Sequence, residues 1–184
     1  MKFSITSILA AALSVQASAL PIVTSDHHVE NRAAETCGYT TVALLRAFSP
    51  SASDHFYTTS VGEMENAILN IGYISEGDAA QVLPSQAPNT VPLYRMYSLG
   101  ATDHFYTTNA AERATAISQL GYTDEGITAY VYPSNLCGSV PLYRMYNPKV
   151  ADHFYTTSAG ERDNAITALG YVDEGIAAYV NPSQ

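Results

Sequence analysis

Tryptophan, N-glycosylation acceptors and long apolar runs are missing from this chain of 184 residues, and basic residues are few. The sequence has no Trp, 2 Cys, and 8 Lys plus Arg against 17 Asp plus Glu, which gives a net charge of −9. Such an acidic surface repels phosphate backbones and anionic lipid headgroups, so we expect no nucleic-acid partner and no membrane partner. No run reaches the roughly 20 apolar residues that a membrane-spanning helix needs.

The N-terminus has the features of a secretory signal peptide. Lys2 supplies the positive charge, residues 5–15 form a short apolar segment, and Ala17-Ser18-Ala19 fits an A-x-A cleavage signal. We therefore expect residues 1–19 to be a signal peptide and residues 20–36 to be a flexible segment. The mature protein is expected to be secreted, extracellular or associated with a cell wall.

The two cysteines, Cys37 and Cys137, are expected to pair in an oxidising compartment. A bridge between them closes a loop of about 100 residues, to which the chain-entropy model assigns about 4–5 kcal/mol. A free reactive thiol is the alternative.

One hexapeptide, Asp-His-Phe-Tyr-Thr-Thr, occurs three times, at residues 54–59, 103–108 and 152–157. Each copy follows the last by 49 residues, and thirty of 45 aligned positions are identical between residues 91–135 and 140–184. A fixed period of this length indicates a repeat architecture. We predict one domain over residues 37–184, with repeats at 42–90, 91–139 and 140–184.

Each repeat predicts a β-β-α-β unit. In the second, residues 91–97 and 104–108 form a predicted hairpin, and residues 127–131 form a short strand after a turn at Glu125-Gly126. The motif Asn109-x-x-Glu112 fits a helix capping box. Glycines with a structural role are expected after the three helices, at Gly72, Gly121 and Gly170.

The expected fold class is α+β and rich in β-structure. A single unit cannot cover its own apolar face, so the three must pack together. The cysteines lie just before repeats 1 and 3, too far apart in a linear stack for one disulfide. We therefore predict a closed pseudo-threefold, propeller-like ring, with a β-trefoil-like fold as the alternative.

The segments Leu-Tyr-Arg-Met-Tyr, Asp-His-Phe-Tyr-Thr-Thr, Leu-Gly-Tyr and Asp-Glu-Gly-Ile resemble a repeat domain of unknown function in secreted fungal and bacterial proteins. The resemblance runs from Val42 to the C-terminus. It implies a link to walls or glycans, because some bacterial relatives carry the domain beside cell-wall hydrolases. It implies no catalytic residues.

The hexapeptide has a structural interpretation. An Arg–Asp pair, a His that holds a carbonyl group and a Phe in the core would together stabilise a hairpin. The register between the two strands decides which face the Arg shares, and the sequence leaves that register open. The residues assigned to this structural role are Arg46, Asp54, His55, Asp103 and Asp152.

The same repeats also have a ligand-binding interpretation, in which Tyr rings stack on sugars and charged groups bind hydroxyls. Repeat 1 replaces several of these positions, with Leu45 and Gln81 where the other repeats have Tyr. The candidate ligand-binding residues are Tyr94, Arg95, His104, Tyr106, Tyr130, Tyr143, Arg144, His153, Tyr155 and Tyr179.

A metal site and catalysis are the less favoured interpretations. His55, His104 and His153 are related by the repeat and would hold zinc if they converged, but no recognised ligand spacing supports this. We expect no cofactor, no metal and no catalytic residue. The expected function is a secreted, monomeric, non-catalytic module that binds cell-wall polysaccharide or another glycan. The alternative is a protein-interaction or structural protein without a glycan site, and a cell-wall hydrolase is third.

Overall fold

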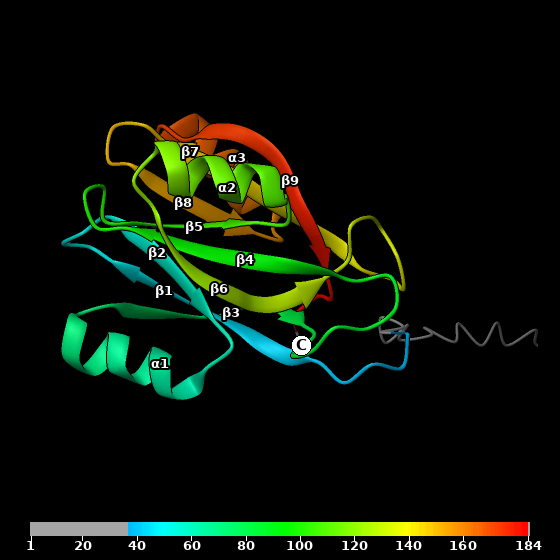
Figure 1. Cartoon of the computed structure of the whole chain (residues 1–184). Coiled ribbons are helices and arrows are strands. Elements are labelled where there is room, and N and C mark those ends of the chain that lie inside the picture. The colour runs from blue at the N-terminus through cyan, green and yellow to red at the C-terminus, as the bar shows by residue number, and fades with distance from the viewer. Residues whose placement is uncertain (1–36, 184) are drawn as a thin grey trace, which may run out of the picture. The chain divides into compact units, whose positions relative to one another are not determined.

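The computed structural model describes residues 37–183, which form three consecutive repeats of two strands, a helix and a third strand (Figure 1). The expected signal peptide and the segment at 20–36 lie outside the described residues. Within residues 37–183, no helix is both long and apolar enough to cross a membrane.

The repeats contain the same elements in the same order. Repeat 1 comprises β1 (Val42–Ser49), β2 (Asp54–Thr58), α1 (Val61–Asn66), the π-helix η1 (Ala67–Ile71) and β3 (Ile74–Val82). Repeat 2 comprises β4 (Val91–Ser98), β5 (Asp103–Thr107), α2 (Ala110–Gln119) and β6 (Thr123–Val131). Repeat 3 comprises β7 (Val140–Asn147), β8 (Asp152–Thr156), α3 (Ala159–Ala168) and β9 (Val172–Val180).

Each repeat makes its own three-stranded antiparallel sheet, in the orders β2-β1-β3, β5-β4-β6 and β8-β7-β9. The described part is mostly β, and the three sheets remain separate. The predicted α+β, propeller-like closed ring is therefore wrong, and the β-trefoil alternative does not describe these sheets either. The disulfide argument constrained two points of the chain, which does not determine how strands pair.

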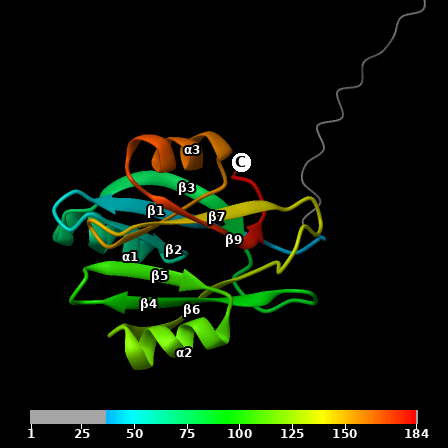
Figure 2. The ribbon, with the colours of Figure 1, turned by 90° about the horizontal axis from the view of Figure 1, so that it is seen from above.

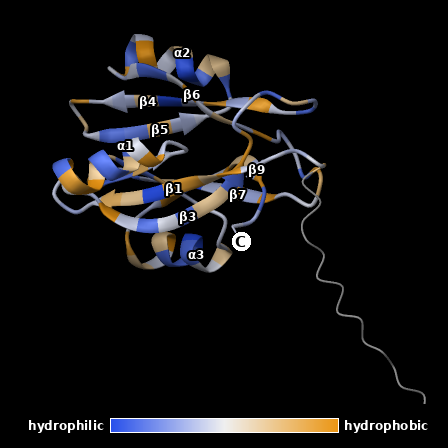
Figure 3. Ribbon diagram, turned by 90° about the horizontal axis from the view of Figure 1, so that it is seen from below, coloured by the Kyte–Doolittle hydropathy of each residue, from blue (hydrophilic) through white to orange (hydrophobic). Residues whose placement is uncertain are grey.

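The sheets meet through side chains and through isolated β-bridges near the ends of their third strands. One face of each sheet contributes to a shared core, for example Leu93, Tyr106 and Val131 from repeat 2. The opposite face packs under the helix of the same repeat, where Met96 and Phe105 contact Ala116. Figure 2 shows α2 and α3 on the outer sides with the strands between them. In Figure 3 these outer helices carry hydrophilic and hydrophobic stretches side by side.

Three tyrosines join the repeats inside the shared core. The hydroxyl of Tyr106 accepts a hydrogen bond from the backbone N–H of Tyr57 at 2.9 Å and donates one to the backbone C=O of Tyr57 at 2.7 Å. Tyr155 bonds to Tyr106 in the same way, and Tyr57 bonds to Tyr155. Burial raises the pKa of all three phenols, so they remain protonated donors. Each hydroxyl thus satisfies a backbone N–H and a backbone C=O at a strand edge, which a neighbouring strand would otherwise pair with.

The helix termini follow the sequence in part. Ser60, Asn109 and Ser158 accept N-cap hydrogen bonds, as predicted. The Glu of the expected capping box does not return to the N-cap: Glu112 accepts from Thr107, whose hydroxyl accepts from the N–H of Asn109. The Glu side chain is thereby directed towards the next repeat.

Glycine conformation is needed at two kinds of position in each repeat. Gly121, which follows the C-cap residue Leu120 of α2, has φ +76°, as a C′ glycine requires. Gly126 has φ +89° and pairs with Arg95 inside β6, next to shifts in the strand register. The predicted turn at Glu125-Gly126 is therefore a bulge within a longer strand, which begins at Thr123.

The predicted disulfide between Cys37 and Cys137 is confirmed, with a Cα–Cα distance of 5.3 Å and a sequence separation of 100 residues. It ties the segment before repeat 1 to the segment before repeat 3. On the chain-entropy model, a loop of this length is worth about 4–5 kcal/mol of stability.

Candidate functional site

The strand register separates the Arg and Asp of the repeated motifs. In repeat 2, Tyr97 pairs with His104 and Arg95 pairs with Tyr106. Because side chains alternate along a strand, Arg95 lies on the same face as His104, and Asp103 lies on the other face. The Arg–Asp pair considered from the sequence is not formed within the hairpin.

Each Asp of the hexapeptide binds the His of a neighbouring repeat. Asp54 accepts from the backbone N–H of His104 at 2.8 Å, and its second oxygen is 2.6 Å from the Nδ1 of His104. The hydroxyl of Tyr73 donates to the same oxygen. The carboxyl group of Asp54 therefore holds both the backbone and the ring of His104. Burial and the charge of Asp54 raise the pKa of Tyr73, which keeps its hydroxyl a donor.

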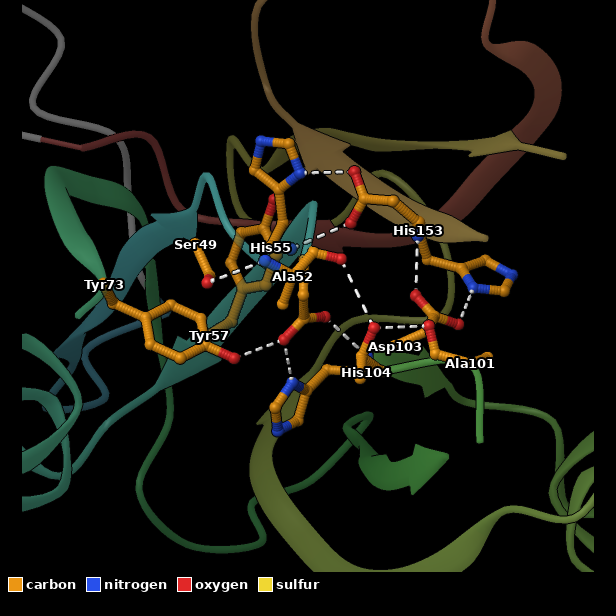
Figure 4. A network of polar contacts seen from close by, with 12 residues as sticks. Ser49, Ala52, His55, Tyr57, Tyr73, Ala101, Asp103, His104 and His153 are labelled. Atoms are coloured by element: carbon orange, nitrogen blue, oxygen red, sulfur yellow. Dashed lines mark hydrogen bonds and ion pairs between the residues drawn. The ribbon is translucent and has the colours of Figure 1, made fainter. Parts of the chain in front are cut away.

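The other repeats reproduce this arrangement, as Figure 4 shows for the labelled His55, His104 and His153. Asp103 binds His153 and Tyr122, and Asp152 binds His55 and Tyr171. All three carboxylates are fully buried. Since a buried carboxylate without donors is costly, this network stabilises the contacts between repeats.

These three carboxylates also converge, with one oxygen of each lying within 4.8 Å of the others. The three histidines form no such group among residues 37–183. The zinc alternative needed the histidines to converge, but each Nδ1 faces a different Asp. The structure thus directs the histidines towards protein contacts between repeats.

A second interaction between repeats places one Arg between two Glu residues. The terminal nitrogens of Arg144 donate to both carboxylate oxygens of Glu112 in α2, at 2.9 and 3.0 Å. Its Nε lies 2.8 Å from Glu174 in β9. This last pair is close without being aligned as a hydrogen bond, so we treat it as an ion pair. The guanidinium lies 5.2 Å from the centroid of the Phe105 ring.

We call each such group an Arg–Glu triad, and the chain has one at every pair of repeats. The triads are Arg95 with Glu63 and Glu125, Arg144 with Glu112 and Glu174, and Arg46 with Glu161 and Glu76. Partial burial opposes ionisation of Glu112, but hydrogen bonds from Arg144 and Thr107 outweigh it and lower its pKa. Glu63 and Glu161 are shifted in the same direction for the equivalent reasons.

Two equivalent cavities lie beside these triads. The 2/3 cleft, between repeats 2 and 3, has a volume of 290 Å³, and the 1/2 cleft, between repeats 1 and 2, has 280 Å³. The 2/3 cleft is lined by Phe105, Glu112, Thr115, Ala116, Leu120, Tyr122, Arg144, His153 and Glu174. The 1/2 cleft is lined by Phe56, Glu63, Asn66, Ala67, Ile71, Tyr73, Tyr97, His104 and Glu125.

A further hollow of 200 Å³ adjoins the 1/2 cleft. It shares Glu63 and Glu125 with that cleft and adds Arg95 and the polar segment Thr58–Ser60. The two carboxylates of this Arg–Glu triad therefore line both the cleft and the hollow at the repeat boundary.

The predicted ligand-binding residues divide into three groups. Arg95, His104, Arg144 and His153 line the cavities. Tyr106 and Tyr155 are each only 1% exposed and form the core network, which removes them from the residues that can touch a ligand.

The remaining candidates lie away from the three described cavities. Tyr94 lies under Arg113 and Tyr143 lies under Arg162, with ring-to-guanidinium distances of 4.4 and 4.5 Å. Tyr130 and Tyr179 take part in the β-bridges between repeats.

Sequence reasoning missed most of each cavity wall, because its candidates include only Arg144 and His153 in the 2/3 cleft and His104 in the 1/2 cleft. It assigned Glu112 only to helix capping and Tyr122 only to the Leu-Gly-Tyr motif, and it gave Phe105 to the core. The recurrence of each residue in all three repeats was the available signal, but recurrence does not show which side chains converge.

The comparisons give the chain one family match. The family model described as "Domain of unknown function (DUF5648)" matches residues 43–181. No curated protein and no solved structure matches the chain.

Proposed function

The chain belongs to the DUF5648 domain family, whose description names no activity, and we propose that it is a secreted, non-catalytic module that binds a cell-wall polysaccharide. The observation that carries the proposal is the repeated cleft between neighbouring repeats. Each cleft combines aromatic rings with several hydrogen-bonding groups on an open surface.

The chemistry of the clefts suits a sugar. The half-buried Tyr122 and the exposed Leu120 supply apolar surface that packs against sugar C–H groups, and carboxylates beside them accept hydrogen bonds from hydroxyls. The hollow next to the 1/2 cleft adds Arg95 and the polar segment Thr58–Ser60 to this surface. Repetition of the cleft favours a polymer, because linked sites gain avidity from repeated units.

Catalysis is less compatible with these clefts than binding. A glycoside hydrolase needs one carboxyl group that stays protonated to act as the acid. The hydrogen bonds of Arg144 and Thr107 instead lower the pKa of Glu112, despite its partial burial. The pKa of Glu63, in the 1/2 cleft, is also lowered.

Binding to insoluble chitin, β-glucan and peptidoglycan, together with a glycan array, tests the proposal. We expect at least one polysaccharide to retain the wild-type protein. Asn66 and Thr115 are exposed and line the two clefts, so Trp at both positions obstructs the clefts without entering the core. The double variant N66W/T115W should retain less than about a third of the wild-type binding.

The matched control places the same Trp residues one position earlier on the same helices. Glu65 and Ala114 are exposed and line neither cleft, so E65W/A114W should bind like the wild type. Equal binding by both double variants would move the site elsewhere on the surface. A folded wild-type protein that binds none of the glycans contradicts the proposal and favours the protein-interaction alternative.

A further inference from the structure

We infer that the ligand of the clefts is a cationic polysaccharide, namely a polymer of amino sugars whose amines are not acetylated. The inference rests on the proposed function and narrows it to one chemical class. It is based on the groups of each Arg–Glu triad that remain exposed to a ligand.

The guanidinium group of each triad is largely buried, and its N–H groups already face the two Glu carboxylates. Beside the 1/2 cleft, Arg95 donates to both oxygens of Glu63, and its Nε faces Glu125. Its side chain is 13% exposed, while those of Glu63 and Glu125 are 38% and 29% exposed. A ligand in the cleft therefore meets carboxylate oxygens more readily than guanidinium N–H groups.

The triad also leaves an excess of negative charge. Two carboxylates and one guanidinium carry a net charge of −1 at neutral pH, and the same set recurs at all three pairs of repeats. The nearby imidazole of His104 hydrogen-bonds to Asp54 through Nδ1, and its Nε2 lies 4.0 Å from the carboxylate of Glu125. No Lys or further Arg lines either cleft to balance this charge.

A ligand that complements this surface must bring donors and positive charge. Sugar hydroxyls provide donors, but an ammonium group adds a charge-assisted hydrogen bond to a carboxylate, which is about twice as strong as a neutral one. The apolar walls, Tyr73 with Ile71 and Tyr122 with Leu120, still favour the apolar face of a sugar ring. An amino-sugar polymer supplies both features in every unit.

Calorimetric titration with two hexasaccharides of the same backbone separates the contribution of the charge to the affinity from that of the sugar ring. One is the β-1,4-linked hexamer of glucosamine, and the other is its fully N-acetylated counterpart. We expect the glucosamine hexamer to bind at least about tenfold more tightly, which corresponds to about 1.4 kcal/mol. Its affinity should fall as salt is raised, because added ions screen partly exposed charges.

Variants that neutralise the cleft keep its shape, because Gln retains the acceptor oxygen that faces the Arg. One carboxylate of each triad is replaced, and the combined substitutions are Glu76→Gln, Glu125→Gln and Glu174→Gln. In a triple variant with an unchanged thermal transition, the preference for the glucosamine hexamer should fall to less than about threefold.

The control variant removes the same amount of charge from exposed carboxylates that line none of the described cavities. Its substitutions are Glu65→Gln, Asp163→Asn and Asp173→Asn. The tenfold preference should survive in this variant, and its loss there would assign the preference to net charge instead of the clefts.

The outcomes for the two proposals differ. Equal or tighter binding of the N-acetylated hexamer, or of a neutral β-glucan, overturns the cationic class while glycan binding stands. Absence of binding to every glycan overturns the proposed function itself.

Discussion

At the scale of single residues, one side chain often satisfies groups of two repeats. Asp103 accepts hydrogen bonds from His153 in β8 of the next repeat and from Tyr122 in its own repeat, and so it links the two repeats. The single hydroxyl of Tyr106 hydrogen-bonds to both the backbone N–H and the backbone C=O of Tyr57. Such residues recur because every boundary between repeats needs its own copy.

We predict that Tyr106→Phe lowers the free energy of unfolding by about 2–4 kcal/mol, because the buried N–H and C=O of Tyr57 both lose their partner. Urea unfolding measures the change. Tyr94→Phe removes a hydroxyl from the face under α2 and should cost less than about 0.5 kcal/mol. Similar losses in the two variants would contradict the bridging role of Tyr106.

At the scale of elements, each repeat uses glycine to end its helix and a bulge to shape its third strand. Gly121 and Gly170 have φ of +76° and +82°, and a Cβ at either position would meet no atom within 4 Å. Any penalty for a side chain there is therefore conformational.

We predict that Gly121→Ala and Gly170→Ala each destabilise the protein by about 1 kcal/mol, the cost of placing Cβ at positive φ. Gly160 lies in the first turn of α3 without positive φ, so Gly160→Ala should be neutral or stabilising by up to about 1 kcal/mol. Denaturant midpoints give all three values. An unchanged midpoint in both Gly121→Ala and Gly170→Ala would show that the left-handed conformation at the helix ends is not essential.

At the scale of the whole molecule, the three repeats are held together by the shared core, the Asp–His–Tyr network, the Arg–Glu triads and one disulfide. The triads contain Glu side chains whose protonation in acid weakens the contacts between repeats. Glu63, Glu112 and Glu161 all have lowered pKa values in the folded protein, because the Arg and Thr hydrogen bonds outweigh partial burial.

We predict that these carboxylates stabilise the fold above their unfolded pKa, near 4.5, and that their contribution is lost as pH falls through the lower folded values. The free energy of unfolding, measured in urea from about pH 6 down to pH 3, should therefore decrease towards acid. Glu112→Gln should make this decrease shallower, whereas Glu65→Gln, on the exposed side of α1, should leave it unchanged. Parallel pH profiles for the wild type and Glu112→Gln would exclude a contribution from this triad.

The sequence alone determined the features that depend on neighbouring residues. The repeat period, the β-β-α-β order, the N-caps such as Asn109 and the positive φ at Gly121 all follow from local patterns. The disulfide also followed, because only two cysteines exist. The family match over residues 43–181 agrees with the extent of the repeats.

The tertiary structure alone decided the sheet arrangement and the candidate site. Asp54 could pair with the Arg of its own hairpin or with a His in any repeat, and near-identical repeats make these choices indistinguishable in sequence. The fold selects His104, 50 residues away, and directs Glu112 to Arg144, 32 residues away. These contacts form only when whole sheets pack and bring distant residues together. The clefts lie at those same boundaries, so no single repeat encodes one.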